Sequence, residues 1–499
     1  MNGFVRRPFG ESALIPAASV AVGLLLGAVI MLAGSYNPIL AYGSLFSRAF
    51  GDLYNLGETI RQITPYIFTG LAVAFAFRSG LFNIGAEGQF IMGAVAAAAA
   101  GILLELPWYL HVPLALVAGA LTGGLWGAIV GWLKAARGVH EVITTIMLNW
   151  IALHLANYIV RSALLEKGMA RSRYLHESAW LSTPDLTGLF DNARIHYGIL
   201  VALVLAALFR FLLWKTRLGF EFRAVGFNPD ASEYAGINVK SAFVKAMFIS
   251  GLFAGAGGAC EVMGVNAVAS IAFRADQVVS GVALNLLASG ATIYVCKILL
   301  DGAAQTPTLK NVFAKWAVPL LSDIPYLGQA LFIAYPTSYI AFLLVAVVWF
   351  VLYRTPAGLR LRSVGEHPEA ADSLGIRVHR VRYAAVMISG ALAAMGGATI
   401  TLTTTSNFSH STISGQGFIA LAALIFGKWR PAAGMFAALF FGIASALKSV
   451  FQVHGITDSI PVEFIYMFPY ILTVLVLAGF VGRAVAPAAA GKPYRKGER

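Results

Sequence analysis

Residues Thr216–Ala259 read TRLGFEFRAVGFNPDASEYAGINVKSAFVKAMFISGLFAGAGGA, and residues Thr355–Ala398 read TPAGLRLRSVGEHPEAADSLGIRVHRVRYAAVMISGALAAMGGA. Aligned without a gap, about 18 of the 44 positions are identical, which chance does not explain, so the chain contains an internal repeat. In each copy an apolar stretch ends in a basic residue, a short polar stretch follows, and a Gly-rich apolar stretch begins. The repeat therefore predicts a polar segment held between two membrane helices.

The composition places the chain in a membrane. Hydrophobic residues make up 58% of the 499 residues and charged residues only 12%, whereas a soluble domain carries about 25% charged residues. Long uninterrupted apolar runs indicate helices rather than barrel strands, which alternate apolar and polar residues. We predict an all-α polytopic membrane protein with about 12–13 transmembrane helices. Met1–Gly34, with Arg6 and Arg7 before its apolar run, is read as the first of them rather than as a cleaved signal.

Basic residues set the expected orientation. The net charge of +13 is concentrated at helix ends and in a few loops, which favours cytoplasmic topology over binding of nucleic acid. The repeated polar segments near residues 215–245 and 354–382 are the most basic loops, so both are expected in the cytoplasm.

A second similarity defines the units. His140–Ala152 (HEVITTIMLNWIA) is similar to Asp276–Ala288 (DQVVSGVALNLLA). The second unit therefore lacks a counterpart of residues 1–139, and the first lacks one of residues 403–499. We predict a first unit at 1–265 with about seven helices and a second at 266–499 with about six. Natural fusion and deletion both explain the join near 265–275, and the helix nearest to it is expected to be re-entrant, half-spanning or displaced.

No pattern typical of an enzyme is present. The Gly427-Lys428 pair is followed by Trp429 rather than Ser or Thr, so a phosphate-binding loop is absent, and no metal-binding or nucleophile motif occurs. The acidic residues within the apolar runs, Glu87, Glu141 and Glu261, lie near helix ends and form no ion relay. The energy for transport must then come from a partner, or the protein is a passive channel.

Arg78–Gly93 (RSGLFNIGAEGQFIMG) is the most distinctive stretch that occurs once. Its three polar residues could line a partly unwound helix that meets a polar solute, or form a cytoplasmic turn with the acid at the start of the next helix; the two readings are equally supported. Two asparagines occupy matching positions in the two units, where hydrogen bonding between helices is favoured over solute contact. The candidate residues for the solute path or gate are Asn83, Glu87, Gln89, Asn149 and Asn285.

Each repeated polar segment contains Val-Gly, a Pro, small and acidic residues, and Gly-Ile. Pro favours the first turn of a helix and Gly ends one, so each segment predicts a short amphipathic helix that could transmit force from a motor protein. In the following apolar stretches, small residues recur every fourth position and predict close helix packing. The candidate coupling residues are Arg223, Gly226, Pro229, Ala231, Gly236 and Ile237, and Arg362, Gly365, Pro368, Ala370, Gly375 and Ile376.

Four motifs together identify a family resemblance: FNIGAEGQ, HEVITTIMLNW, two loops of the form VGxxPxAxxxxGI, and GFIALAALIFGKWRP. The chain resembles inner-membrane permeases of binding-protein-dependent ABC importers, in the branch that serves simple sugars, nucleosides and branched-chain amino acids. It is similar to parts of two partner permeases joined in one chain.

The resemblance implies the permease fold, in a bacterial cytoplasmic membrane, and import of a nucleoside or, second, a simple sugar. It implies that both loops dock on cytoplasmic ATPase subunits, which bind the ATP, so the chain itself needs no cofactor or metal. An extracytoplasmic solute-binding protein and a second permease chain are further expected partners. The alternatives are a passive channel or secondary carrier for small polar solutes, and a transport-incompetent fusion.

Overall fold

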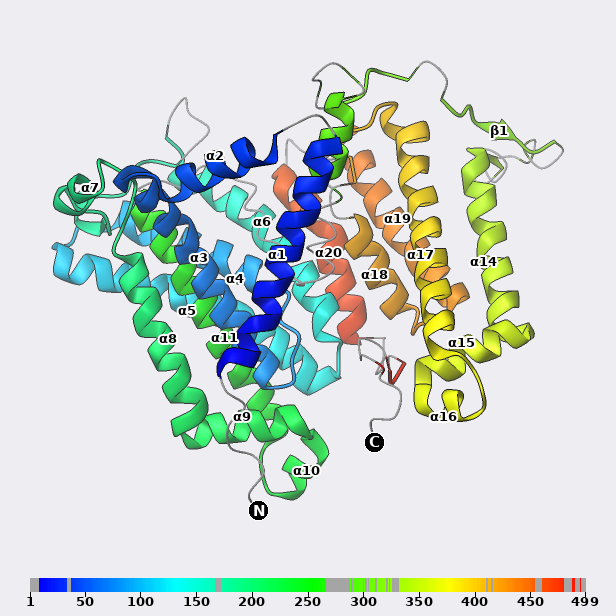
Figure 1. Ribbon diagram of the computed structural model, residues 1–499, viewed down its shortest axis with the longest axis horizontal. Coiled ribbons are helices and arrows are strands. Elements are labelled where there is room, and N and C mark those ends of the chain that lie inside the picture. Colours follow the sequence, from blue (N-terminus) through cyan, green and yellow to red (C-terminus); the bar gives the residue numbers. More distant parts are fainter. Residues whose placement is uncertain are drawn as a thin grey trace.

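The computed structural model of the chain is a bundle of helices (Figure 1). Among the described residues, eight helices are long and apolar enough to cross a membrane. The predicted all-α membrane fold is therefore confirmed. The structure describes residues 9–33, 37–166, 172–265, 288, 290–298, 300, 303, 305–309, 312–319, 322, 324, 332–409, 412–413, 416–453, 460–479, 487–489 and 494.

Helix α11 (Val239–Val265) is the centre of the first unit and packs against α3 (Leu53–Arg78), α4 (Ala86–Leu103) and α5 (Trp108–Arg137). Small residues make this contact close. A Cβ added at Gly251 or Gly255 of α11 would collide with the backbone of α5 near Gly123. Such a direct approach of two backbones is what small residues at four-residue spacing permit. The predicted packing role of this stripe in the first unit is confirmed.

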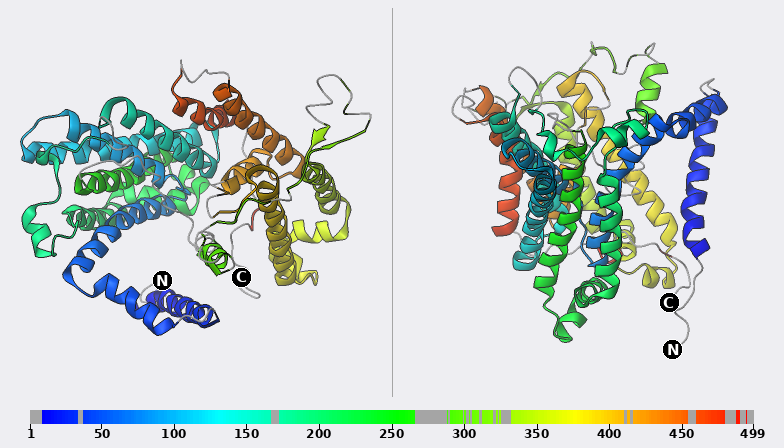
Figure 2. Two further views of the ribbon diagram at one scale, coloured as in Figure 1. Left: turned by 90° about the horizontal axis from the view of Figure 1, so that it is seen from above. Right: turned by 90° about the vertical axis from the view of Figure 1, so that its left-hand side faces the viewer.

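The remaining elements of the first unit surround this core. Helix α1 stands beside the bundle and meets α2, where the Tyr42 hydroxyl donates to the Leu24 carbonyl at 2.6 Å (Figure 2). Helix α8 packs on α3. The bounds of these elements are α1 Phe9–Ala33, α2 Pro38–Phe50, α6 Glu141–Ile159, η1 Val160–Leu164, η2 Glu177–Ala179, α7 Pro184–Leu189 and α8 Gly198–Lys215.

The first part of the second unit is open to its surroundings. Helices α14 (Pro336–Arg354) and α17 (Val378–Ile400, continued by η3, Thr401–Thr405) have no buried residue in their apolar windows within the described part of the chain. A short antiparallel pair, β1 (Trp316–Ala317) with β2 (Ile333–Ala334), precedes α14. This pair is the one sheet among the residues that are described.

The last three helices pack on the first unit rather than on α14 and α17 alone. Helix α20 (Val462–Gly479) lies along α6, where Tyr470 stacks on Trp150 with ring centroids 5.7 Å apart. Helices α18 (Gln416–Phe426) and α19 (Pro431–Val453) share an apolar cluster with α6. The three helices come from residues 416–479, a region for which the first unit has no counterpart in sequence, and α18 and α20 contact α6 of that unit. The division at 265 and 266 stays a prediction, and the join itself lies outside the described residues.

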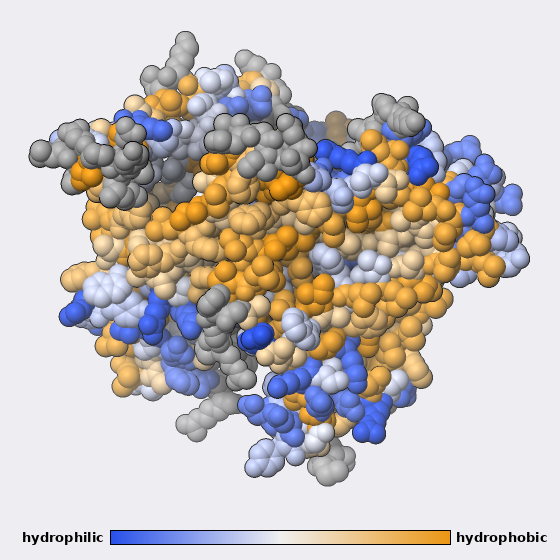
Figure 3. All heavy atoms as spheres, turned by 180° about the vertical axis from the view of Figure 1, so that it is seen from behind, coloured by the Kyte–Doolittle hydropathy of each residue, from blue (hydrophilic) through white to orange (hydrophobic). Residues whose placement is uncertain are grey.

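Both repeated polar segments lie at the same end of the bundle, as the basic loops predict (Figure 1). The first comprises α9 (Arg217–Phe227) and α10 (Pro229–Tyr234), and the second comprises α15 (Pro356–Glu366) and α16 (Pro368–Ser373). Figure 3 shows a broad apolar band across the molecule, with polar residues gathered above and below it. The band has the character of a membrane-embedded surface.

Candidate functional site

The first repeated element, α9 and α10 with the Gly-Ile pair that follows, is built by local capping. The Thr216 hydroxyl accepts a hydrogen bond from the Gly219 amide at 3.1 Å and donates one to the last turn of α8. The chain therefore changes direction at Thr216, and α9 begins directly after α8. The Asn228 side chain caps α10 by accepting from the Ala231 amide at 3.1 Å. Gly236 ends α10 with φ of +80°, in the left-handed region that favours glycine.

The second repeated element, α15 and α16 with its Gly-Ile pair, has the same construction. Thr355 caps α15, Pro368 begins α16, and Gly375 ends it with φ of +80°. The Ile376 amide then donates to the Ala371 carbonyl at 3.1 Å, as the corresponding Ile237 amide does to Ser232 in the first element. The predicted short helices, with Pro at the start and Gly at the end, are confirmed. The longer helices α9 and α15 before them were not predicted.

The predicted arginines stabilise both elements in the same way. The Arg223 guanidinium lies over the Trp214 ring at 4.8 Å, and that of Arg362 lies over the Tyr353 ring at 5.1 Å. In each case the ring belongs to the last turns of the preceding apolar helix. A cation over an aromatic face is attracted by the quadrupole of the ring. These contacts fix α9 to α8 and α15 to α14.

The two elements differ in what they pack against. In the first, Gly226 contacts the turn after α3: a Cβ at Gly226 would collide with the Arg78 carbonyl and lie 3.0 Å from the Gly80 nitrogen. In the second, a Cβ at Gly365 would meet Pro487 at 3.8 Å, and the Ala489 amide donates to the Gly365 carbonyl at 3.0 Å. The first element thus rests on the α3–α4 turn, and the second on residues near the C-terminus.

The surfaces of the elements also differ. Phe227 and Tyr234 are 90% and 98% exposed at the tip of the first element. Glu366 and Ser373 occupy the matching positions of the second. Among the other predicted coupling residues, Pro229, Ala231, Ala370 and Gly375 are exposed, and Ile237 and Ile376 are half-buried. Both elements therefore expose part of the predicted set, and at these two matching positions only the first exposes aromatic rings.

Asn83 and Gln89, both buried, join the start of α4 to α11. The Asn83 amide donates to Gln89 Oε1 at 3.0 Å and to Ser250 Oγ of α11 at 2.7 Å. Asn83 Oδ1 accepts from the Gly85 amide at 2.8 Å, and Ser250 donates to the Ala72 carbonyl of α3 at 2.6 Å. This network connects three helices directly behind the Gly80–Gly226 contact.

The other predicted path residues have distinct positions. Asn149 of α6 accepts from the Gly88 amide at 2.8 Å and donates to the Ile84 carbonyl at 3.0 Å, which is the hydrogen bonding between elements that we favoured. Glu87 lies in the first turn of α4. Asn285 lies outside the described residues. A role of these residues in the solute path stays a prediction.

Two of the three acids singled out in the sequence, Glu141 and Glu261, are paired with bases. Glu141 accepts from Lys134 Nζ at 2.6 Å, and Glu261 from Arg61 at 3.2 Å. Arg61 also contacts Glu58, which holds Arg194 through two side-chain hydrogen bonds of 3.0 and 2.9 Å. The hydrogen bonds that Arg194 donates to the Glu58 carboxylate raise the pKa of Arg194 above its usual value. This cluster ties α3, α11 and the residues before α8 together.

Sequence reasoning missed two contributors to the site, Gly80 and Ser250. Ser250 left a signal, because a serine precedes the first glycine of the small-residue stripe in both repeats, at Ser250 and Ser389. Gly80 belongs to the distinctive Arg78–Gly93 stretch, but its contact with Gly226 could not be predicted, because it joins positions about 150 residues apart.

The chain matches the family model described as branched-chain amino acid transport system / permease component twice, over residues 55–271 and 261–477. It is 47% identical over 306 residues to the guanosine ABC transporter permease protein NupP of Bacillus subtilis (strain 168), covering 60% of this chain and 88% of that protein. It is 52% identical over 236 residues to NupQ of the same strain, covering 47% and 74%. The nucleoside ABC transporter permease protein NupC of Lactococcus lactis is 45% identical over 236 residues, covering 46% and 73%. No solved structure matches the chain.

Proposed function

The chain belongs to the permease family of the branched-chain amino acid transport system, and from that premise we propose that it imports a nucleoside with energy from separate ATPase subunits. It is a multi-pass membrane permease of the ABC importer class. The proposal covers the solute, the partner proteins and the bacterial cytoplasmic membrane as its location.

The observation that carries the proposal is the pair of elements at one end of the bundle, each fixed to the helix before it by capping and by an arginine on an aromatic ring. Phe227 and Tyr234 project almost fully exposed from a polar end. Large aromatic rings exposed in this way are typical of residues that enter a pocket of a protein partner. We assign that partner as an ATPase subunit on the cytoplasmic side.

A continuous set of contacts leads from the first element into the membrane helices. A displacement of α9 reaches the α3–α4 turn through Gly226 and Gly80, which have no side chains to absorb it. The turn leads to Asn83, whose hydrogen bonds reach α4 and α11. Because interiors are close-packed, such contacts transmit small shifts rather than absorb them. This is how ATP-driven movement of a partner would alter the bundle.

The solute assignment rests on relatives. The relatives named above carry guanosine or nucleoside in their names, and one glucose permease, TsgB13 of Haloferax volcanii, is more distant at 31% identity. A nucleoside is therefore placed before a simple sugar. A separate extracytoplasmic binding protein delivers it.

The test is uptake of labelled guanosine by bacterial cells that lack their own nucleoside importers and express the chain with its ATPase and binding-protein partners. We expect uptake that stops when ATP is depleted. Uptake that persists without ATP indicates a passive channel or secondary carrier. Normal membrane insertion without uptake indicates a transport-incompetent fusion.

A double variant tests the coupling elements. Gly236→Asp with Gly375→Asp places side chains at two positive-φ positions and adds charge to both docking surfaces, while a Cβ at either site contacts no described atom within 4 Å. We expect ATP-driven uptake to be lost with membrane insertion intact. The matched control is Gly188→Asp in α7, at the opposite end of the bundle, whose Cβ site is equally open among the described residues. Unchanged uptake in the double variant removes the coupling role.

A further inference from the structure

Helices α11 and α17 carry the same small-residue face but have opposite surroundings. Gly251 and Gly255 of α11 correspond in the repeat to Gly390 and Ala394 of α17, and Ser250 corresponds to Ser389. The apolar window of α11 is 67% buried, whereas that of α17 has no buried residue in the described part of the chain. Within the described residues, one copy of this face is buried and the other is not.

In the first unit the face is covered by a hairpin of two helices. The backbone of α5 at Gly123 packs directly against Gly251 and Gly255. The backbone of α4 at Phe90 packs in the same way against Gly258. Ser250 accepts the hydrogen bond from Asn83, in the turn before α4. The face therefore binds two small-residue helices and one side-chain amide.

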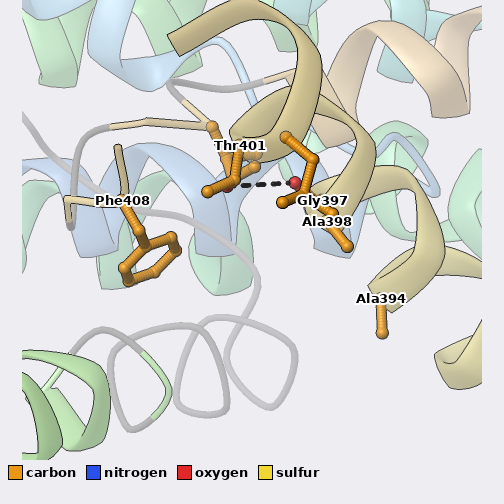
Figure 4. A pocket seen from close by; sticks show the side chains of 7 residues that line it. Ala394, Gly397, Ala398, Thr401 and Phe408 are labelled. Atoms are coloured by element: carbon orange, nitrogen blue, oxygen red, sulfur yellow. Dashed lines mark hydrogen bonds between the residues drawn. The ribbon is translucent and has the colours of Figure 1, made fainter. Parts of the chain in front are cut away.

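In the second unit, Ser389 and Gly390 are open among the described residues, whereas a Cβ at Gly397, the counterpart of Gly258, would meet Ile413 at 3.7 Å. No described atom lies within 4 Å of a Cβ added at Gly390, and Ser389 is exposed. The large neighbours Met387 and Ile388 are 74% and 61% exposed. Further along α17, a pocket of about 360 Å³ adjoins Gly397 and Ala398 and is closed on one side by Phe408 (Figure 4). An exposed serine and glycine in the middle of an apolar surface favour a helix partner over lipid.

The missing cover is identified by the repeat itself. The second unit has no counterpart of residues 1–139, which include α3, α4 and α5. The chain's own α4 and α5 are already bound to α11. A second copy of the chain has the same helices occupied in the same way, so neither source supplies a free α4–α5 hairpin to α17 without unpacking the first unit.

We propose that the α17 face formed by Ser389, Gly390, Ala394 and Gly397 binds a helical hairpin of a separate membrane polypeptide. The occupant resembles the α3–α5 segment: an asparagine in the turn before its second helix donates to Ser389, and small residues at four-residue spacing lie against Gly390 and Ala394. The partner supplies in trans the helices that the second unit lacks. This inference does not depend on the solute or on the direction of transport.

The experiment uses the full chain and a defined probe. The probe is a polypeptide of residues 53–139 of this chain, carrying Asn83→Cys and co-expressed with the full chain in bacterial membranes. In the full chain, Cys260 and Cys296 are replaced by Ala and Ser389 by Cys. Because Asn83 Nδ2 lies 2.7 Å from Ser250 Oγ in the first unit, the two new thiols meet if the hairpin docks on α17 in the same way. Mild oxidation then joins probe and chain by a disulfide.

Two variants control the result. Ile388→Cys places the thiol one residue away, at nearly the same depth but on another side of α17, and we expect it to cross-link at least tenfold less than Ser389→Cys. Adding Gly390→Leu to the Ser389→Cys chain blocks close approach and should reduce cross-linking at least fivefold. A Cβ at Gly390 has no described atom of the chain within 4 Å, so we expect the fold to be kept, and elution in size-exclusion chromatography checks this.

Three results overturn the inference. Equal cross-linking at Ser389 and Ile388 shows no oriented docking. Cross-linking that is unaffected by Gly390→Leu shows that the small-residue face is not the contact. A disulfide-linked dimer of the Ser389→Cys chain that forms without the probe and excludes it shows that a second copy occupies the face.

Discussion

The contrast between Gly226 and Gly365 offers the sharpest test of how the first element acts on the membrane helices. The two glycines hold matching positions near the ends of α9 and α15. A methyl group at Gly226 would collide with the Arg78 carbonyl, whereas one at Gly365 meets Pro487 at the ordinary contact distance of 3.8 Å. Replacing each by alanine therefore makes the same chemical change in two different environments.

The expected difference follows from two contributions. Forcing an extra methyl into a close contact costs about 1–3 kcal/mol. Alanine in place of glycine in a helix contributes at most about 1 kcal/mol of stability, and this gain is similar in α9 and α15. The helix term cancels between the two variants, so Gly226→Ala should be less stable locally than Gly365→Ala by about 1–3 kcal/mol, or about 5- to 150-fold in an opening equilibrium.

Hydrogen exchange measured by mass spectrometry on the solubilised chain reports this equilibrium separately for each helix. Protection of the α9 amides should fall in Gly226→Ala, while protection of the α15 amides should stay level or rise in Gly365→Ala. Guanosine uptake should fall in the first variant and persist in the second. Equal changes in amide protection in α9 and α15 would refute the reasoning, because the close Gly226–Gly80 contact would then make no difference to the stability of α9.

Three further predictions address the core, the junction of the two units and the response to pH. Asn83→Ala should cost about 1–3 kcal/mol for each buried group left without a partner, including the Gly85 amide, and lower the SDS concentration at which the bundle unfolds; Thr69→Ala at a half-buried site of α3 should change it far less. Met467→Ala in α20, 4% exposed, should destabilise the α6–α20 contact by about 2–5 kcal/mol and speed proteolysis after α18; unchanged proteolysis would argue that α20 does not rest on the first unit. Burial, and secondarily Arg61, lower the pKa of His196 from 6.5 to about 4. Between these two pH values His196 is protonated in the unfolded chain but neutral in the folded chain. Stability should therefore be unaffected above pH 6.5 and fall by about 3 kcal/mol as the pH drops from 6.5 to 4, and His196→Gln should remove that fall in a pH series of thermal unfolding.

The local parts of the site could be predicted from the sequence because local residues determine them. Pro229 and Pro368 set the starts of the short helices, and Gly236 and Gly375 end them by adopting a backbone conformation that other residues avoid. Composition alone determined the helical membrane fold, since few charged residues are available to cover a soluble surface.

Tertiary structure decided what those elements touch. Gly226 and Gly365 are the same residue in the same repeat, but one lies against Gly80 and the other against Pro487. The stripe of α11 is covered, whereas the apolar window of α17 has no buried residue in the described part of the chain, and α18 and α20 contact α6 of the other unit. Turn and cap signals act over a few residues, whereas these contacts depend on which distant segments are present to bury each face. The sequence by itself determined the elements and their ends, and only the packing of segments far apart in the chain decided which of two similar small-residue faces is buried.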